Sequence, residues 1–418
     1  MKYILINVIL VFVLDVSAQL TLEQVLDDLK TASPENELIN ISKESTHLAE
    51  KNLSNAWKPQ ISFSAQSTYQ SDVTSLNVEI PGFQVPSVNE FQYKAQGEVS
   101  QLLLDAGRIK AHRESIYVNS LIEQKQSEIQ LDQIKSQVIL LYFNILESEQ
   151  VIKALQSKVE ALDARRSVLK AGVDNGAILE SELFNLDAAI LNLDQEIMRV
   201  MRHRNVSIQT LSIFCGKEYK LDEEFVVPEV TQLPTSAGSL IFHELMQQQS
   251  LSIDAMQKVK DGDSKPQLVA FGQLGLGNPG LNFLEEGLTD YYIIGMRLNW
   301  KLGNLYSRGN DRQINILMKD KIATQKEIFD RNWKSVDTQL KNQIEMEDEL
   351  VEINTSLLQL RSSITLVAQA QLDNGIINSA DYISRLDEEY SAKVNLEIAK
   401  IRRLKNQYQL THHYNLLP

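Results

Sequence analysis

Residues 170–183 read KAGVDNGAILESEL, and residues 369–382 read QAQLDNGIINSADY, so one Asp-Asn-Gly turn occurs twice, about 200 positions apart. In each copy an acid, Glu182 or Asp381, stands six places after the glycine. Asn and Gly tolerate the left-handed backbone that ends a helix. Each turn therefore predicts the end of a helix, and each half of the chain contains one such turn.

Long helical patterns lead into both turns. Residues 107–171 contain no proline, and their apolar residues recur at steps of three and four, which is typical of a helix that packs along one seam. Residues 305–372 have the same character. At 1.5 Å per residue the first helix would be on the order of 95 Å long, far beyond an ordinary globular helix. These segments are predicted to be coiled-coil-like rods.

Helical patterns also leave both turns, at residues 178–214 and 378–412. Ser181 and Ser379 are candidates to help start these return helices, because serine favours the position before a helix, and a start at another residue is the alternative. The chain therefore contains two long antiparallel helical hairpins.

Shorter segments between the helices alternate with a period of two, the pattern of β-strands with one apolar and one polar face. Two of the four follow a Lys-Pro-Gln sequence, which ends the preceding helix. The polar faces carry the charged residues Lys94, Glu98 and Arg297. The strands are predicted at about 59–70, 91–103, 266–277 and 290–301.

Both halves present the same elements in the same order: helix, two strands, long helix, Asp-Asn-Gly, long helix. Such an ordered set of matches indicates an internal duplication. The first repeat covers residues 19–215, a polar proline-containing linker covers 216–236, and the second repeat covers 237–418. The fold class is therefore mainly α with a small β part.

Residues 1–18 have the pattern of a signal peptide. Lys2 is followed by an apolar run at 4–14 that is too short to cross a bilayer as a helix. Val16-Ser17-Ala18 provides small residues for cleavage, although Asp15 is unusual so close to such a site. An uncleaved anchor is the alternative, and export is the expected fate of the chain.

Composition excludes several other functions. The formal net charge of −14 argues against a nucleic-acid partner. The single cysteine, Cys215, cannot form an internal disulfide. The stretch GLGNPG (275–280) matches a dinucleotide-binding pattern only formally, since a membrane-type strand and not a helix follows it. We expect no enzyme activity, no metal and no cofactor.

The strands have the length of membrane-crossing β-strands, about 9–11 residues, so their apolar faces are expected to meet outer-membrane lipid. Four strands cannot close into a barrel, and open edges in lipid would leave main-chain groups unpaired. Several chains must therefore share one barrel. Two copies would give eight strands and a filled interior, whereas three give twelve and a lumen that suits the polar strand faces.

The combination resembles the TolC-like outer-membrane efflux proteins, the outer-membrane factors of tripartite export systems. The resemblance covers nearly the whole chain after residue 18. It is carried by LTLEQVLDDL (20–29), the two Lys-Pro-Gln junctions, QLLLDAGR (101–108) and the two Asp-Asn-Gly turns. It implies a homotrimer with a 12-stranded barrel in the cell outer membrane, continued by an α-helical tunnel that extends far into the periplasm. It also implies two partners, a periplasmic adaptor (membrane fusion) protein and an inner-membrane pump of the RND or ABC type.

The resemblance also implies functional residues. The turns would contact the adaptor, through Asp174, Asn175, Gly176, Asp373, Asn374 and Gly375. Acids just after the second turn would close the tunnel in a ring, and Asp381 matches one such place. Ser384 stands where the next acid is expected, with Asp387 one turn further, and Glu182 is the first-half counterpart of Asp381.

Three functions stay open at this stage. The leading one is a passive duct for small molecules such as drugs and toxic compounds. A protein-secretion duct of a type I system would use the same architecture. An exported structural coiled-coil protein would explain the long helices, but it would have no use for the alternating strands.

Overall fold

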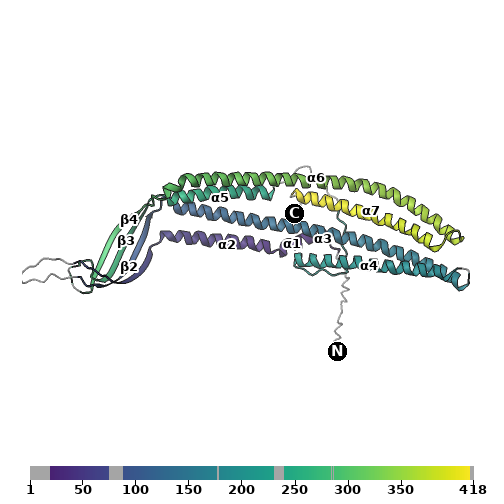
Figure 1. The fold of residues 1–418 in the computed structure, drawn as a ribbon, viewed down its shortest axis with the longest axis horizontal. Coiled ribbons are helices and arrows are strands. Elements are labelled where there is room, and N and C mark those ends of the chain that lie inside the picture. The colour runs from purple at the N-terminus through teal and green to yellow at the C-terminus, as the bar shows by residue number, and fades with distance from the viewer. Residues whose placement is uncertain are drawn as a thin grey trace, which may run out of the picture. The chain divides into compact units, whose positions relative to one another are not determined.

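The structure is a computed structural model that describes residues 19–74, 88–176, 178–229, 240–283, 285 and 287–414. The expected signal peptide and the end of the expected linker, residues 230–236, lie outside this range. Figure 1 shows the elements, which in chain order are α1 (Leu22–Ala32), α2 (Pro34–Ser54), the short 3₁₀ helix η1 (Asn55–Trp57), β1 (Gln60–Tyr69), β2 (Phe91–Leu104), α3 (Arg108–Asp174), α4 (Glu180–Cys215), α5 (Ile241–Asp263), β3 (Gln267–Asn278), β4 (Thr289–Asn299), α6 (Asn304–Asp373) and α7 (Ser379–His413).

Helices dominate the described residues and one small antiparallel sheet accompanies them, which confirms the predicted mainly α fold. The helices α3 and α6 have 67 and 70 residues. Each turns back into a shorter helix, α3 into α4 and α6 into α7 (Figure 1). These are the two long hairpins that the sequence predicts. The closed barrel and the number of copies stay predictions.

The sheet contains four strands in the order β1-β2-β3-β4, with every neighbouring pair antiparallel. Each strand begins and ends within two residues of the expected range. At one end of the sheet, here called the helix end, all four strands connect to helices. At the other end, the loop end, β1 connects to β2 and β3 to β4 through the segments 70–90 and 279–288. The pairing of β2 with β3 joins the two halves of the chain.

The two faces of the sheet differ in chemistry. The apolar face carries aliphatic and aromatic side chains that no described element covers, and Ile61 and Ile294 on it are each 81% exposed. On the opposite, polar face the register places Ser62 opposite Glu98 and Gln66 opposite Lys94. An exposed aliphatic face of this kind is not stable in water, since burying it against an apolar medium is favourable.

Among the described residues of one chain, nothing pairs with the two outer edges of the sheet. β1 pairs only with β2, and β4 pairs only with β3. Each edge therefore presents a row of main-chain N–H and C=O groups that can pair with another strand.

The described chain divides into two compact units, and each draws on both sequence repeats. The sheet unit comprises Leu38–Ser127 and Ile241–Ile328. The helical unit comprises Met1–Glu37, Glu128–Leu240 and Phe329–Pro418. The repeats are thus units of chain order and not of packing, because helices from both halves share the same apolar clusters.

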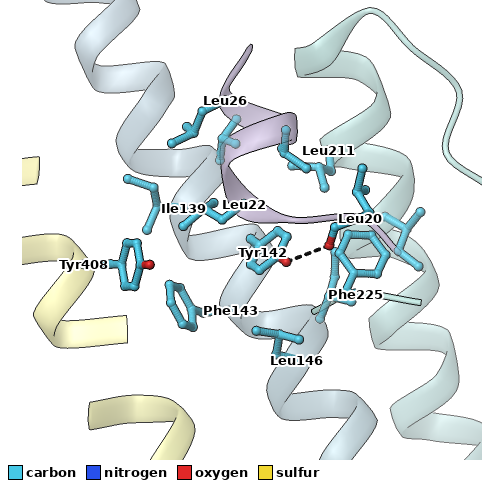
Figure 2. Close-up of a cluster of buried hydrophobic side chains, with 14 of the residues drawn as sticks. Leu20, Leu22, Leu26, Ile139, Tyr142, Phe143, Leu146, Leu211, Phe225 and Tyr408 are labelled. Atoms are coloured by element: carbon cyan, nitrogen blue, oxygen red, sulfur yellow. Dashed lines mark hydrogen bonds between the residues drawn. The ribbon is translucent and has the colours of Figure 1, made fainter. Parts of the chain in front are cut away.

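The main core of the helical unit forms around α1 and Tyr142 of α3 (Figure 2). Leu22, Val25, Leu26 and Leu29 recur at helical spacing, so α1 buries one apolar stripe. Its start is fixed by a capping box, in which Thr21 and Gln24 bond to each other's main-chain N–H groups.

Tyr142 ties two distant segments to this core. Its hydroxyl lies 2.8 Å from the carbonyl oxygen of Leu20 and 2.6 Å from that of Val226, and its single O–H is shared between these two acceptors. Leu20 and Phe225 form a parallel bridge beside it. Burial raises the pKa of Tyr142 far above its usual range, so the hydroxyl stays a donor.

The expectation that serines start the return helices is wrong. Leu179 holds the N-cap position of α4 without a side-chain bond, and Asn378 holds that of α7. Asn378 Oδ1 accepts from the Asp381 N–H at 2.8 Å. Ser181 and Ser379 fall inside the first turns, where the backbone is already helical and a cap cannot form.

Replacing Tyr142 with Phe should remove the hydroxyl donor while keeping the ring, at a cost of about 1–3 kcal/mol. We expect amide hydrogen exchange of Val226, whose N–H donates to Leu20 at 3.0 Å, to accelerate roughly fivefold or more. Tyr117→Phe, at a side chain that is 55% exposed, is the control and should change nothing. Equal exchange in Tyr142→Phe and the native protein would show that the hydroxyl does not hold these segments.

Candidate functional site at the hairpin tips and on the polar sheet face

The two Asp-Asn-Gly turns have the same atomic structure. Asn175 Nδ2 donates to the Ala171 carbonyl at 2.8 Å, and Asn374 Nδ2 donates to the Ala370 carbonyl at 2.7 Å. Each of these carbonyls also accepts from the main-chain N–H of the same asparagine at 3.2 Å, so the amide side chain adds a second bond at the end of the helix. The following glycine adopts the left-handed conformation in both tips, with φ of +70° at Gly176 and +67° at Gly375.

The predicted adaptor-contact residues all lie on the surface of the tips. The six residues are Asp174, Asn175, Gly176, Asp373, Asn374 and Gly375, and every one is exposed. Asp373 also has a partner inside the chain, because its carboxylate forms an ion pair with Arg165 of α3. Arg165 is almost fully buried and lies 6.0 Å from the ring centroid of Tyr382 on α7. This arginine therefore connects the two hairpins next to their tips.

The three predicted aperture acids do not come together in one cluster. The Glu182 carboxylate accepts from the Ser379 N–H at 2.8 Å and from the Ser379 hydroxyl. Asp387 forms an ion pair with Lys158 of α3. Asp381 is exposed, and its side chain has no partner among the described residues. Two of the three acids thus hold the hairpins together, and one points away from such contacts.

Glu182 acts as a cap that one hairpin supplies to the other. Ser379 is the first residue of α7, so its N–H is one of the donors that a helix start leaves free. A carboxylate at this position also lies at the positive end of the helix dipole. The bond therefore stabilises α7 with a side chain from α4.

The basic partners of these acids were not predicted from the sequence. Lys158 and Arg165 lie seven residues apart, beside the apolar seam of α3. Two cations at heptad spacing next to a seam favour acids on a neighbouring helix. The identity of those acids, more than 200 residues away, depends on the packing of the hairpins.

An apolar cluster lies under these polar contacts. Leu162 and Leu169 of α3 pack with Leu186 of α4 and with Tyr382 and Leu386 of α7. Burial raises the pKa of Tyr382, and the Arg165 cation opposes that shift. The hairpins therefore share one core near their tips, and the ion pairs set their register.

The three charged residues predicted for a lumen lie on the polar face of the sheet. Arg297 Nη1 of β4 approaches Glu98 Oε1 of β2 at 3.7 Å. Glu98 also accepts from Gln273 Nε2 of β3 at 2.6 Å. The Lys94 ammonium lies 4.9 Å from the ring centroid of Tyr291. The face thus presents a compensated pair and a separate cation.

A metal centre has no support in the described part of the chain, where no three His, Cys, Asp or Glu side chains gather. Among the described helices, none combines the length and the apolar character needed to cross a bilayer.

No protein-family model matches the chain, and no curated protein matches it. Solved structures do match. CmeC, an outer membrane channel of Campylobacter jejuni, aligns with 94% of this chain and 85% of its own at a TM-score of 0.71 and 14% identity. The outer membrane channel MtrE of Neisseria gonorrhoeae, in an open state, aligns with 94% of this chain and 88% of its own, at a TM-score of 0.67 and 12% identity. VceC, an outer membrane protein of Vibrio cholerae, aligns with 94% of this chain and 95% of its own, at a TM-score of 0.63 and 12% identity.

These structures are TolC-like outer-membrane factors, and the chain has their fold over nearly its whole length. The resemblance that the sequence suggested is confirmed at the level of the fold.

Replacing Gly375 with Ala should strain the second tip. A Cβ there would meet no atom within 4 Å, so the cost arises from the left-handed backbone alone, about 1–2 kcal/mol. Exchange of the Ile376 amide, which donates to Gln371 at 2.8 Å, should become roughly fivefold faster or more. Gly309→Ala is the matched control with the opposite sign. Gly309 lies inside α6 with open space around it. Alanine favours the helix more than glycine does, so Gly309→Ala should slow the exchange of the α6 amides around position 309. The same response in both variants would refute the assignment of strain to the tip.

Proposed function

We propose that the protein is the outer-membrane channel of a tripartite export system and serves as a passive exit duct for small molecules. The observation that carries the proposal is a four-stranded sheet with an exposed apolar face, an opposed polar face and two unpaired edges. The sheet occurs in a chain whose fold is that of outer-membrane channels.

The apolar face is suited to lipid. Phe63 and Met296 on it are more than 70% exposed, and Tyr292 has a similar exposure. A hydrocarbon environment removes the cost of this exposure, which water cannot do. The polar face would then line an aqueous lumen, as in other membrane β-barrels.

The unpaired edges support a shared barrel. In lipid, a strand edge must be paired, because no water is present to bond its main-chain groups. The edge of β4 in one copy can pair with the edge of β1 in the next. With four strands per chain, three copies give twelve strands, which is large enough for a lumen. We propose a homotrimer for this reason.

A seam on α6 gives independent support for several copies. Seven apolar side chains on α6 recur at alternating steps of four and three, and each is between 36% and 64% exposed. This is the spacing of a coiled-coil seam. The partner helix α7 packs on another face of α6, where Arg361 pairs with Glu388 and the Ser362 hydroxyl donates to Glu389. The α6 seam comprises Met346, Leu350, Ile353, Leu357, Leu360, Ile364 and Val367.

A second stripe on α4 has a matching position. Phe184, Leu191 and Met198 recur every seven residues and are each at least 59% exposed. Within the helical unit, contacts join α6 to α7, and α7, α3 and α4 contact one another. The two stripes thus lie on α6 and α4, which both contact α7, and both stripes start about two turns from the hairpin tips. We propose that the α6 seam of one copy packs against the α4 stripe of the next, which would build a helical tunnel.

The proposed partners follow from this architecture. A duct has no energy source, so a periplasmic adaptor and an inner-membrane pump of the RND or ABC type would drive export. The exposed tips, with the Asp-Asn-Gly residues, are the proposed adaptor contact, and the matching tip geometry supports an origin of the two repeats by duplication.

The alternatives differ in what they leave unexplained. A type I protein-secretion duct would have the same sheet and seams, and the choice depends on the pump. A structural coiled-coil protein would not need the exposed apolar face of the sheet.

Cell fractionation with detergent extraction, followed by the mass of the purified particle, tests the proposal. We expect an outer-membrane protein that needs detergent and has the mass of three chains. Leu360→Glu, which places a charge in the α6 seam, should reduce the trimer fraction severalfold or more. Gln359→Glu adds the same charge beside the seam and should leave the trimer intact. A particle of one or two chains that is soluble without detergent would refute the channel.

Asp381 tests the proposed aperture. If its exposed carboxylate lines the narrow end of the tunnel, Asp381→Ala should raise the ion conductance of the purified channel about twofold and shift its ion permeability toward anions. Asp320→Ala removes an exposed acid of α6 far from the tip in sequence and should have no effect. Unchanged conductance and unchanged ion preference in Asp381→Ala would remove this residue from the aperture.

A further inference from the structure

Two aromatic rings on the polar face lie flat over glycines of the neighbouring strand. Tyr291 of β4 is paired with Gly275 of β3, and Phe271 of β3 is paired with Gly295 of β4. A Cβ at Gly275 would come within 2.5 Å of the Tyr291 ring, and one at Gly295 within 3.1 Å of the Phe271 ring. The absent side chains therefore allow both rings to lie against the sheet and not to project from it.

The flat position lets Tyr291 reach across β3. Its hydroxyl donates to Gln96 Oε1 of β2 at 2.9 Å, and the residue is only 6% exposed. The Lys94 ammonium of β2 lies above the same ring, 4.9 Å from its centroid. An ammonium over an aromatic face is attracted to it but keeps its full charge. The ring thus positions Lys94 without neutralising it.

The second ring supports a different arrangement. Arg297 lies 4.6 Å from the ring centroid of Phe271, and its guanidinium also approaches the Glu98 carboxylate at 3.7 Å. This cation is therefore compensated by an acid, whereas Lys94 has no carboxylate partner among the described residues.

The charge of the polar face follows from the strand sequences, which the structure describes completely. Of the charged residues in the four strands, Lys94, Glu98 and Arg297 lie on the polar face and Asp290 lies on the apolar face. Two cations and one acid leave one positive charge per chain on the polar face.

We propose that this face selects for anions, so that the channel favours exported solutes with an anionic group, and that Lys94 is the residue responsible. The inference rests on the proposed function, since it needs the polar face to line a lumen. Several copies would then place one uncompensated ammonium each around a passage whose lipid-facing wall has a low dielectric constant, which strengthens the field inside. The flat rings keep the passage open, so the charge acts on solutes without a steric block.

Charge can be exchanged at position 94 in an already folded channel. In Lys94→Cys, thiol reagents of the methanethiosulfonate class attach either an ammonium or a sulfonate group. The other cysteine, Cys215, is buried and 1% exposed, so it will not react. The readout is the chloride-to-potassium permeability ratio of single channels in a planar bilayer under a KCl gradient. Ile294→Cys, on the apolar face and 81% exposed, is the matched control.

We expect the chloride-to-potassium permeability ratio to fall about threefold in Lys94→Cys. It should recover when the ammonium reagent is attached and fall further when the sulfonate reagent is attached. The Ile294→Cys channel should respond to neither reagent. A Lys94→Cys channel that conducts normally and keeps the native ratio through both treatments would overturn the anion selectivity and leave the duct intact. Native protein that forms no channel at all would overturn the proposed function, and the selectivity with it.

Discussion

The main-chain N–H and C=O groups along the free edges of β1 and β4 place the strongest constraint on this protein. In water such an edge can be solvated, but the sheet that carries it exposes Ile61, Phe63 and Ile294 on one whole face. A sheet cannot put that face in hydrocarbon and keep its edges in water. Only strands with a matching polar and apolar alternation can pair with both edges, and in the proposed assembly another copy of the same chain supplies them.

The helical unit meets a similar constraint with different chemistry. Its two hairpins share an apolar cluster that includes Leu162, Leu186 and Tyr382, while ion pairs such as Lys158–Asp387 lie around it. Ion pairs near the surface contribute little free energy each, so the cluster provides most of the stability and the pairs determine the register. The α6 seam has no such cluster among the described residues. In the proposed assembly it packs on a neighbouring copy, as the edges of the sheet do.

Local patterns were sufficient to predict much of this architecture. The strands follow from alternation with a period of two, and the hairpin tips follow from Asp-Asn-Gly, because both depend on residues close together in sequence. The cap of α7 was assigned to the wrong residue because Ser379 and Asn378 are both good caps, and only the backbone decides between them.

Contacts between the halves could not be predicted in this way. The Glu98–Gln273 bond and the Tyr291 ring over Gly275 require the register of β2 with β3 and of β3 with β4, which no single segment encodes. The same holds for Arg165, whose partner Asp373 lies on the other hairpin. Each of these side chains had an ordinary local context, and its role depends on what the fold places opposite it.

The two acids that follow the repeated turn show how the halves have come to differ. Glu182 and Asp381 occupy equivalent positions after Gly176 and Gly375. Glu182 reaches the first N–H of α7 and stabilises the start of that helix, so its charge is committed to a contact inside the chain. At the second tip, Asn378 already caps α7 by accepting from the Asp381 main chain, and the Asp381 carboxylate remains exposed. The first acid has therefore taken a structural role that the second does not need, and in the proposed channel only the second is free to act on a solute that passes the tip.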